Sequence, residues 1–118
     1  MLELLEWLLA FKYSCKLNHW KTNEYAKHLL FDRLQEDIDD LVDNIAEEYF
    51  MSSAKQNELD KEIFNIEYID KDLAKLSIEI KEHIEMIVNK YSYNQGILSL
   101  LGNISESFDE KIALLKLN

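Results

Sequence analysis

Apolar residues recur every three or four positions along most of this chain, which is the spacing of an amphipathic α-helix. Four helices are predicted, over residues about 2–20, about 24–50, 66–91 and 97–115. The plausible linker is 51–59, and a turn at 92–96 separates the last two helices. Amphipathic helices with short connections are typical of bundles, so we expect an all-α four-helix bundle that forms a single domain over residues 1–118.

The second predicted helix combines an apolar seam with an acidic stripe. It contains no glycine or proline, so we expect it to be continuous. The seam consists of Phe31, Leu34, Ile38, Leu41, Ile45 and Tyr49, and the stripe beside it of His28, Asp32, Glu36, Asp39, Asp43 and Glu47. Eight acidic residues but a single basic one, Arg33, lie between His28 and Glu48. Such an accumulation of like charge is unfavourable unless solvent, salt or bound cations offset it.

The overall composition narrows the range of partners. The 118 residues include no proline, two glycines and 47% apolar residues, which favours long helices. The formal net charge is −10, from 23 acidic and 13 basic residues. This excess repels nucleic acids and anionic membranes and suits cations or basic partners. We therefore expect neither a nucleic acid nor a membrane as a partner.

The cysteine content and the N-terminal segment bear on the compartment. A lone cysteine, Cys15, rules out an internal disulfide and fits a reducing environment, and its apolar neighbours predict a buried side chain rather than a nucleophile. The apolar N-terminal segment carries Glu3 and Glu6 where a signal peptide has positive charges, and no segment is long enough to span a bilayer. These features favour a cytoplasmic protein.

Two pairs of potential metal ligands lie on the second helix. His28 and Asp32 are four residues apart, as are Asp43 and Glu47, so each pair occupies one face. On a straight helix His28 and Asp43 are separated by roughly 22 Å, with an angular offset of only about 60°. One chain therefore cannot close both pairs around a single ion. An antiparallel second copy, related by a two-fold axis, would complete the site.

The ligand types favour particular metals. Histidine and carboxylate without cysteine suit iron, manganese or zinc better than a structural thiolate site. The Glu-x-x-His motif of carboxylate-bridged di-iron bundles is absent, because no histidine has a glutamate three positions before it. A di-iron site inside one bundle is therefore not expected, whereas a site between two subunits remains open.

These residues resemble the signature of the Dps-type miniferritins. The pair His19-Trp20, the His28-x3-Asp32 motif and the Asp43-x3-Glu47 motif match that family's spacing, and residues 43–47 are similar to its Asp-x-Ile-Ala-Glu stretch. The close match covers about 17–50. The segment between Trp20 and His28 is about three residues shorter than is usual in the family and lacks its Gly-Pro, and the basic N-terminal extension that many members use on DNA is absent. So compact a version also resembles small ferritin-like proteins encoded by bacteriophages.

The resemblance implies a ferritin-like fold and a ferroxidase, an oxidoreductase acting on metal ions. Iron would be oxidised and sequestered at a di-metal site between two-fold-related subunits, in a homodimer at least and in the family's twelve-subunit shell if the copies close into one. The implied catalytic and metal-binding residues are His19, His28, Asp32, Asp43 and Glu47. Zinc and manganese suit the same ligands, and the oxidant is either dioxygen or peroxide.

Simpler interpretations exist for the same residues. The acidic stripe could be an ordinary solvated helix face, and His19 a hydrogen-bonded residue at a helix end. His83, one turn after Glu79, is expected to be a satisfied histidine at the edge of the core. The alternative function is that of a non-catalytic interaction protein, which keeps a ferritin-like scaffold and uses its acidic surface to bind a basic partner.

Overall fold

The computed structural model describes residues 1–61, 66 and 72–117, and its regular elements are all helical. They are α1 (Leu2–Lys21), α2 (Tyr25–Gln35), α3 (Ile38–Ala46), the π-helix η1 (Glu47–Ser52), the 3-10 helix η2 (Gln56–Lys61), α4 (Leu73–Lys90) and α5 (Gln95–Lys116). The predicted all-α class is confirmed for these residues.

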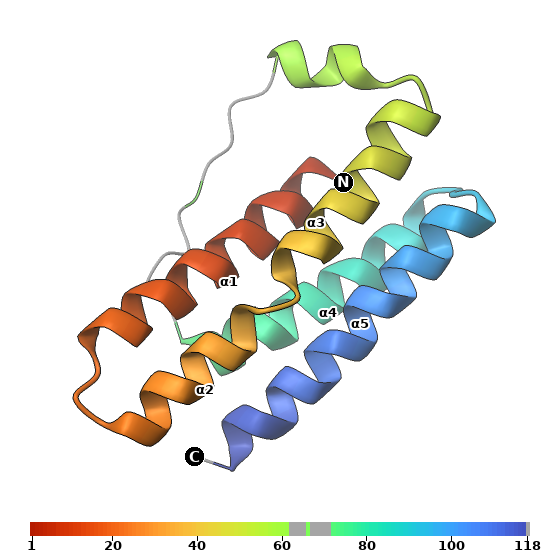
Figure 1. Ribbon diagram of the computed structural model, residues 1–118. Helices are drawn as coiled ribbons and strands as arrows, with labels where there is room; N and C mark the ends of the chain where they lie inside the picture. Colours follow the sequence, from red (N-terminus) through yellow and green to blue (C-terminus); the bar gives the residue numbers. More distant parts are fainter. Residues whose placement is uncertain (62–65, 67–71, 118) are drawn as a thin grey trace.

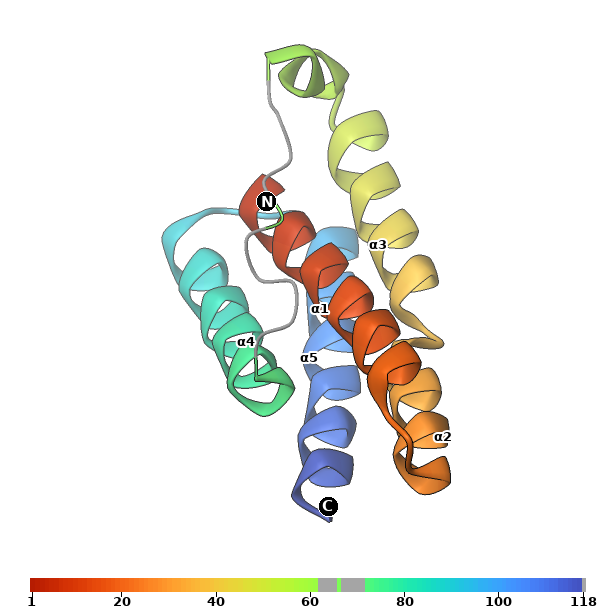
Figure 2. The same ribbon diagram turned by 90° about the vertical axis from the view of Figure 1, so that its left-hand side faces the viewer.

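The helices form four rods, because α2, α3 and η1 follow one another along one side of the molecule (Figure 1). The rod made by α1 packs against α2, α3 and α4, while α5 packs against α3 and α4. Each rod thus has two neighbours, and the order around the bundle is α1, α2–α3, α5, α4 (Figure 2). The four-helix arrangement agrees with the number of amphipathic segments in the sequence.

The core is built from the apolar seams of all four rods. At its centre the rings of Phe11 and Phe108 meet edge to face, with centroids 4.9 Å apart and an angle of 75° between the rings. Both side chains are fully buried. Apolar residues at helical spacing surround them, including Leu4, Leu8, Leu34, Ile38, Ile45, Leu76, Ile80, Leu101 and Ile104. Burial of these side chains is the main stabilising contribution, at about 25 cal/mol per Å² of apolar surface.

The first and last helices match their predicted ranges closely. The third predicted helix begins later than its seam suggested, because α4 starts at Leu73 after Asp72, whose carboxylate accepts hydrogen bonds from the backbone N–H groups of residues 74 and 75. Ile66 lies outside any helix, and Ile69 lies outside the described residues. The predicted turn ends early as well, because Asn94 caps α5 by accepting a hydrogen bond from Ile97 N–H at 2.9 Å.

The expected continuity of the second helix is wrong. α2 ends at Gln35 and α3 begins at Ile38, although no glycine or proline lies between them. The cause is tertiary, because Asp37 is bound by two residues of α5, as described below. The helix changes again at Glu47, where the backbone widens into η1, and the predicted linker contains η2.

α1 is apolar over most of its circumference, and its buried residues come from several faces. Across residues 1–61, 66 and 72–117, however, no helix combines the length with the apolar character that crossing a bilayer would require.

Candidate metal centre

Two of the predicted ligands, His19 and His28, lie against each other where α1 turns back into α2. Their rings are stacked, with centroids 3.6 Å apart and planes inclined by 24°. His19 Nδ1 lies 2.8 Å from the backbone oxygen of His28, and His28 Nδ1 lies 3.0 Å from that of His19. The two helices are therefore joined by a reciprocal pair of histidine-to-backbone hydrogen bonds, between residues nine apart in the sequence.

These hydrogen bonds determine which ring nitrogen is available. A carbonyl oxygen can only accept, so Nδ1 carries the hydrogen in both rings. In the neutral imidazole the lone pair then resides on Nε2, which is the form that ligates a metal. Metal-binding histidines commonly donate their other N–H to a backbone carbonyl, which orients the ring. The predicted alternative, a hydrogen-bonded histidine at a helix end, is also seen here, and the two roles are compatible.

Asp32 lies one turn beyond His28 on α2 and is exposed. Its one hydrogen-bond contact with a described residue is long, at 3.4 Å from Gln35 Nε2 to Asp32 Oδ1. The carboxylate is therefore free to rotate toward a cation near the histidine pair. Its spacing of four residues from His28 keeps it on the same face of the helix.

Asp43 and Glu47 lie beyond the break between α2 and α3. Both are exposed, and neither side chain forms a hydrogen bond or ion pair with another described residue. Glu47 is the first residue of η1 and lines an open pocket of about 410 Å³ together with Asn44, Met51 and Leu100. π-Helical turns are rare and are frequent at functional sites.

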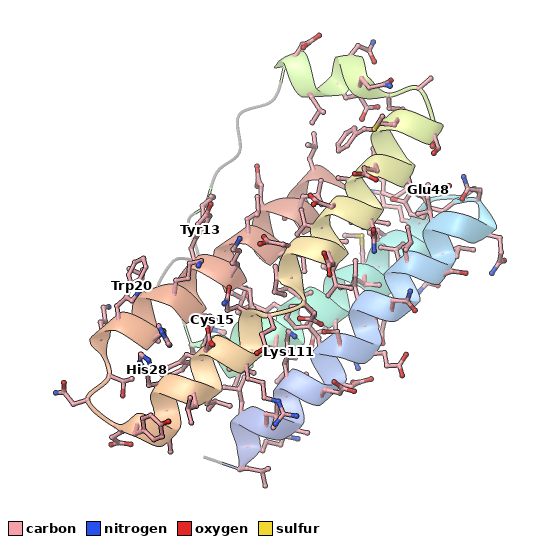
Figure 3. All side chains as sticks on the ribbon, in the orientation of Figure 1. Tyr13, Cys15, Trp20, His28, Glu48 and Lys111 are labelled. Carbon is pink, nitrogen blue, oxygen red and sulfur yellow. The ribbon has the colours of Figure 1, made fainter. Side chains whose placement is uncertain are left out.

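The neighbouring Glu48 has a different role from Glu47. It lies beside the first turn of α5 (Figure 3), close enough to Gly96 that a Cβ added there would approach Glu48 Oε1 to 2.9 Å. A carboxylate at this position is favoured by the partial positive charge of a helix N-terminus. Glu48 therefore packs η1 on α5 and, together with Glu47, also lines the pocket.

The five predicted ligands do not all meet within one chain. Over the described part of the chain, no group of three or more histidine, cysteine, aspartate or glutamate side chains is close enough to hold an ion. The structure brings His19 and His28 together, leaves Asp32 one turn away, and separates Asp43 and Glu47 from them by the break. The straight-helix estimate of their separation no longer applies, because the rod is interrupted.

The chain belongs to a family whose function is undefined. A protein family described as "Family of unknown function (DUF5856)" matches residues 19–115, which is most of the chain and includes all five predicted ligands. No curated protein and no solved structure matches it. Membership in this family assigns no activity, so the chemistry has to be argued from the residues themselves.

The surface around the histidine pair is unusually apolar for an exposed helix end. Trp20 is 70% exposed and projects outward from the bundle (Figure 3), and Tyr25 is 76% exposed. Leu29, one turn after Tyr25, is also exposed. Large side chains with this exposure beside unpaired ligand atoms are typical of a surface that another molecule covers.

Sequence reasoning missed a buried polar cluster at the break. Lys111 is only 5% exposed, and its Nζ lies 2.6 Å from Asp37 Oδ1 and 3.0 Å from Ser107 Oγ. The Ser107 hydroxyl donates a short hydrogen bond to Asp37 Oδ2. The Lys111 ammonium also lies 5.5 Å from the centre of the Phe108 ring. A signal was present, because Lys111 falls on the apolar stripe of the last helix, where a lysine requires a partner.

Two further predictions concern buried side chains. Cys15 is buried as expected, and desolvation raises the pKa of its thiol to about 12, although the Lys111 charge opposes this shift. His83 is also buried, and its ring packs at a tilt of 50° against that of Trp7, with centroids 4.7 Å apart. The prediction that the His83 ring is fully hydrogen-bonded is wrong. Among the described residues its Nε2 has no hydrogen-bond partner.

Proposed function

We propose that this protein is a miniferritin-like, iron-binding protein with a ferritin-like fold, which oxidises Fe(II) between two copies of the chain. The observation that carries the proposal is the pairing of His19 and His28. Each ring donates its Nδ1–H to the other residue's carbonyl, which leaves two oriented Nε2 lone pairs at an exposed helix end. The resemblance to the Dps-type miniferritins supports the same two residues as ligands.

The remaining ligands would come from a second copy. Asp43 and Glu47 are exposed and unpaired among the described residues, and they belong to the same rod as His28 and Asp32. Antiparallel pairing of two such rods about a two-fold axis would bring the acidic pair of one chain to the histidine pair of the other. The exposed Trp20 and Tyr25 rings beside the histidines would be covered by the same contact.

The ligand set suits oxidation of ferrous iron. Carboxylates stabilise Fe(III) more than Fe(II), so Asp32, Asp43 and Glu47 would lower the free energy of the oxidised ions. The neutral imidazoles of His19 and His28 add ligands without adding negative charge. With peroxide as the oxidant, two Fe(II) ions each give up one electron, and hydrogen peroxide takes up these two electrons and two protons to form two water molecules. Iron is the substrate in this reaction.

The proposal is tested by following Fe(II) oxidation through the near-ultraviolet absorbance of the ferric product. Wild-type protein should accelerate oxidation, and the double variant Asp43→Ala/Glu47→Ala should reduce the rate to that of iron in buffer. The matched control is Glu85→Ala/Glu110→Ala, which removes two exposed carboxylates on α4 and α5, outside the rod that carries the proposed ligands, and should keep the wild-type rate. Sedimentation measured in parallel should show at least a dimer.

Two results would contradict the proposal. One is equal, slow oxidation by wild type and by the site variant. The other is a wild-type protein that stays monomeric at micromolar concentration and ignores ferrous salts, because a single chain does not assemble the five ligands. If the control variant lost activity as well, the rate would depend on total negative charge rather than on Asp43 and Glu47.

A further inference from the structure

An open groove runs between α4 and α5, away from the proposed metal centre. The two helices lie side by side and antiparallel (Figure 1), and the groove has a volume of about 420 Å³. Its walls are largely aliphatic. The side chains of Ile84 and Val88 come from one turn of α4, and those of Leu98 and Leu101 come from one turn of α5. The inference drawn from this groove does not depend on iron.

Gly102 is the feature of the groove that calls for an explanation. It lies in the interior of α5, where glycine destabilises a helix relative to alanine. No positive φ requires glycine there, and a Cβ added to Gly102 would meet no atom within 4 Å. Gly96 differs, because Glu48 occupies the space where its side chain would be. Among the described residues none approaches Gly102 closely, so this position of α5 is open to a molecule outside the chain.

The charges around the groove point to the chemistry of the occupant. Glu85 lines the groove, and Glu82 and Glu106 lie one turn from Glu85 and Gly102 on the same helix faces. None of these three carboxylates forms an ion pair with another described residue. The nearby cation, Lys81, is already bound to Asp109. In a two-fold pairing of two copies at this groove the same carboxylates would face each other, with no bound cation between them to offset the charge.

We propose that the α4–α5 groove binds a basic amphipathic helix of another protein. The lining residues span about one and a half turns of α4 (84–89) and about two turns of α5 (98–105), so the groove accepts two aliphatic side chains spaced one turn apart on the incoming helix. Gly102 lets the backbone of that helix approach α5 closely. Lysine or arginine residues beside the aliphatic pair face Glu82, Glu85 and Glu106.

The test uses a synthetic 14-residue helical peptide with leucines on one face and lysines beside them, labelled with fluorescein. Binding to the full chain is measured by fluorescence anisotropy. Gly102→Leu places a bulky side chain in the groove, where its Cβ meets no described atom within 4 Å, and we expect it to weaken binding by about tenfold or more. Asn103→Leu is the matched control, because it adds the same side chain at the adjacent exposed position of α5 and should leave binding unchanged.

Charge is tested separately. Glu85→Lys should weaken binding of the lysine peptide by about threefold to tenfold, with a smaller effect at high salt. A peptide with glutamates in place of the lysines should bind at least about tenfold more weakly to wild type. Circular dichroism of each variant checks that the helices are retained.

Each contrary outcome overturns the proposal. If the lysine peptide does not bind to wild type, the groove does not bind a basic helix. If Gly102→Leu and wild type bind the peptide equally well, the peptide recognises general acidity rather than the groove. If wild type self-associates and Gly102→Leu does not, the groove is instead an interface between copies of this chain.

Discussion

The break at Asp37 and the histidine pair at the α1–α2 turn both join the α2–α3 rod to a neighbouring helix through polar side chains, but they differ in how many of their polar atoms have partners. At the break, the Asp37 carboxylate is bound through one oxygen to Lys111 and through the other to Ser107. At the turn, each histidine uses Nδ1 in a hydrogen bond and leaves Nε2 as an unused ligand atom. The carboxylate oxygens at the break are therefore both paired within the chain, whereas the Nε2 atoms at the turn have no partner among the described residues.

The side chains around the two regions also differ in how far they are buried. Lys111 is buried against the core and contacts the Phe108 ring, and its charge is balanced by the ion pair with Asp37. The histidines lie next to the exposed Trp20 and Tyr25. The ion pair at the break, whose lysine is buried, contributes to the fold, while the unused Nε2 atoms beside exposed aromatic rings fit the binding function that we propose.

The largest effect expected is the loss of stability on replacing Asp37. Asp37→Ala leaves the Lys111 ammonium buried without its carboxylate, which costs about 3–5 kcal/mol for a fully buried pair. The Asp37 side chain is itself 44% exposed, so water reaches the site and we expect a loss of about 2–3 kcal/mol. Urea denaturation monitored by circular dichroism measures it.

Two companion variants sharpen this result. Asp40→Ala, at an exposed position in the first turn of α3, should change stability by less than about 0.5 kcal/mol. The double variant Asp37→Asn/Lys111→Met removes both charges and should recover most of the lost stability. If Asp37→Ala and Asp40→Ala were equally mild, the break would not depend on its contact with α5.

A smaller effect is expected from pH, through His83. Desolvation lowers the pKa of this histidine in the folded protein, although Glu3 partly opposes the shift. The unfolded chain, with a histidine pKa of about 6.5, therefore binds the proton more readily. Stability is retained at higher pH and falls as the pH drops below 6.5, by at most about 1.4 kcal/mol at pH 5.5 for this group.

The measurement is the urea midpoint at pH 7.5 and at pH 5.5, for wild type and for His83→Leu. The variant should lose less stability between the two pH values, because it has no group at this position to protonate. Comparing the two proteins isolates the contribution of His83, whose unpaired nitrogen lies inside the core, because His19 and His28 are present in both. An unchanged pH dependence would show that His83 takes up its proton equally well in the folded state.

The smallest effect on stability is expected at the histidine pair. His28→Ala removes the hydrogen bond from His28 Nδ1 to the His19 carbonyl and the stacking of the two rings, and it should cost about 1 kcal/mol. Its effect on binding of Co(II), used as a spectroscopic probe, should be much larger, with affinity lowered at least about tenfold. If His28→Ala lost stability but kept its affinity for Co(II), the histidine pair would have a structural role, like the contact at Asp37, and would not bind metal.

Much of the fold is accessible from the spacing of apolar residues, and the candidate site only in part. The seam with Phe108 and the buried position of Cys15 follow from helical periodicity, because burial depends mainly on which face a residue occupies. Periodicity also places Asp43 and Glu47 on one face. It could not reveal the interruption at Asp37, because the contact that causes it joins residues 74 positions apart.

The amino-acid sequence by itself determined the helical class, the four amphipathic rods and the residues able to bind a cation, because these depend on local spacing and side-chain chemistry. Tertiary structure alone decided that His19 and His28 stack and donate to each other's backbone, that Lys111 interrupts the second rod through Asp37, and that Gly102 faces an open groove. The physical reason is that these features arise from contacts between helices, whose hydrogen bonds and burial outweigh the local preference of each segment.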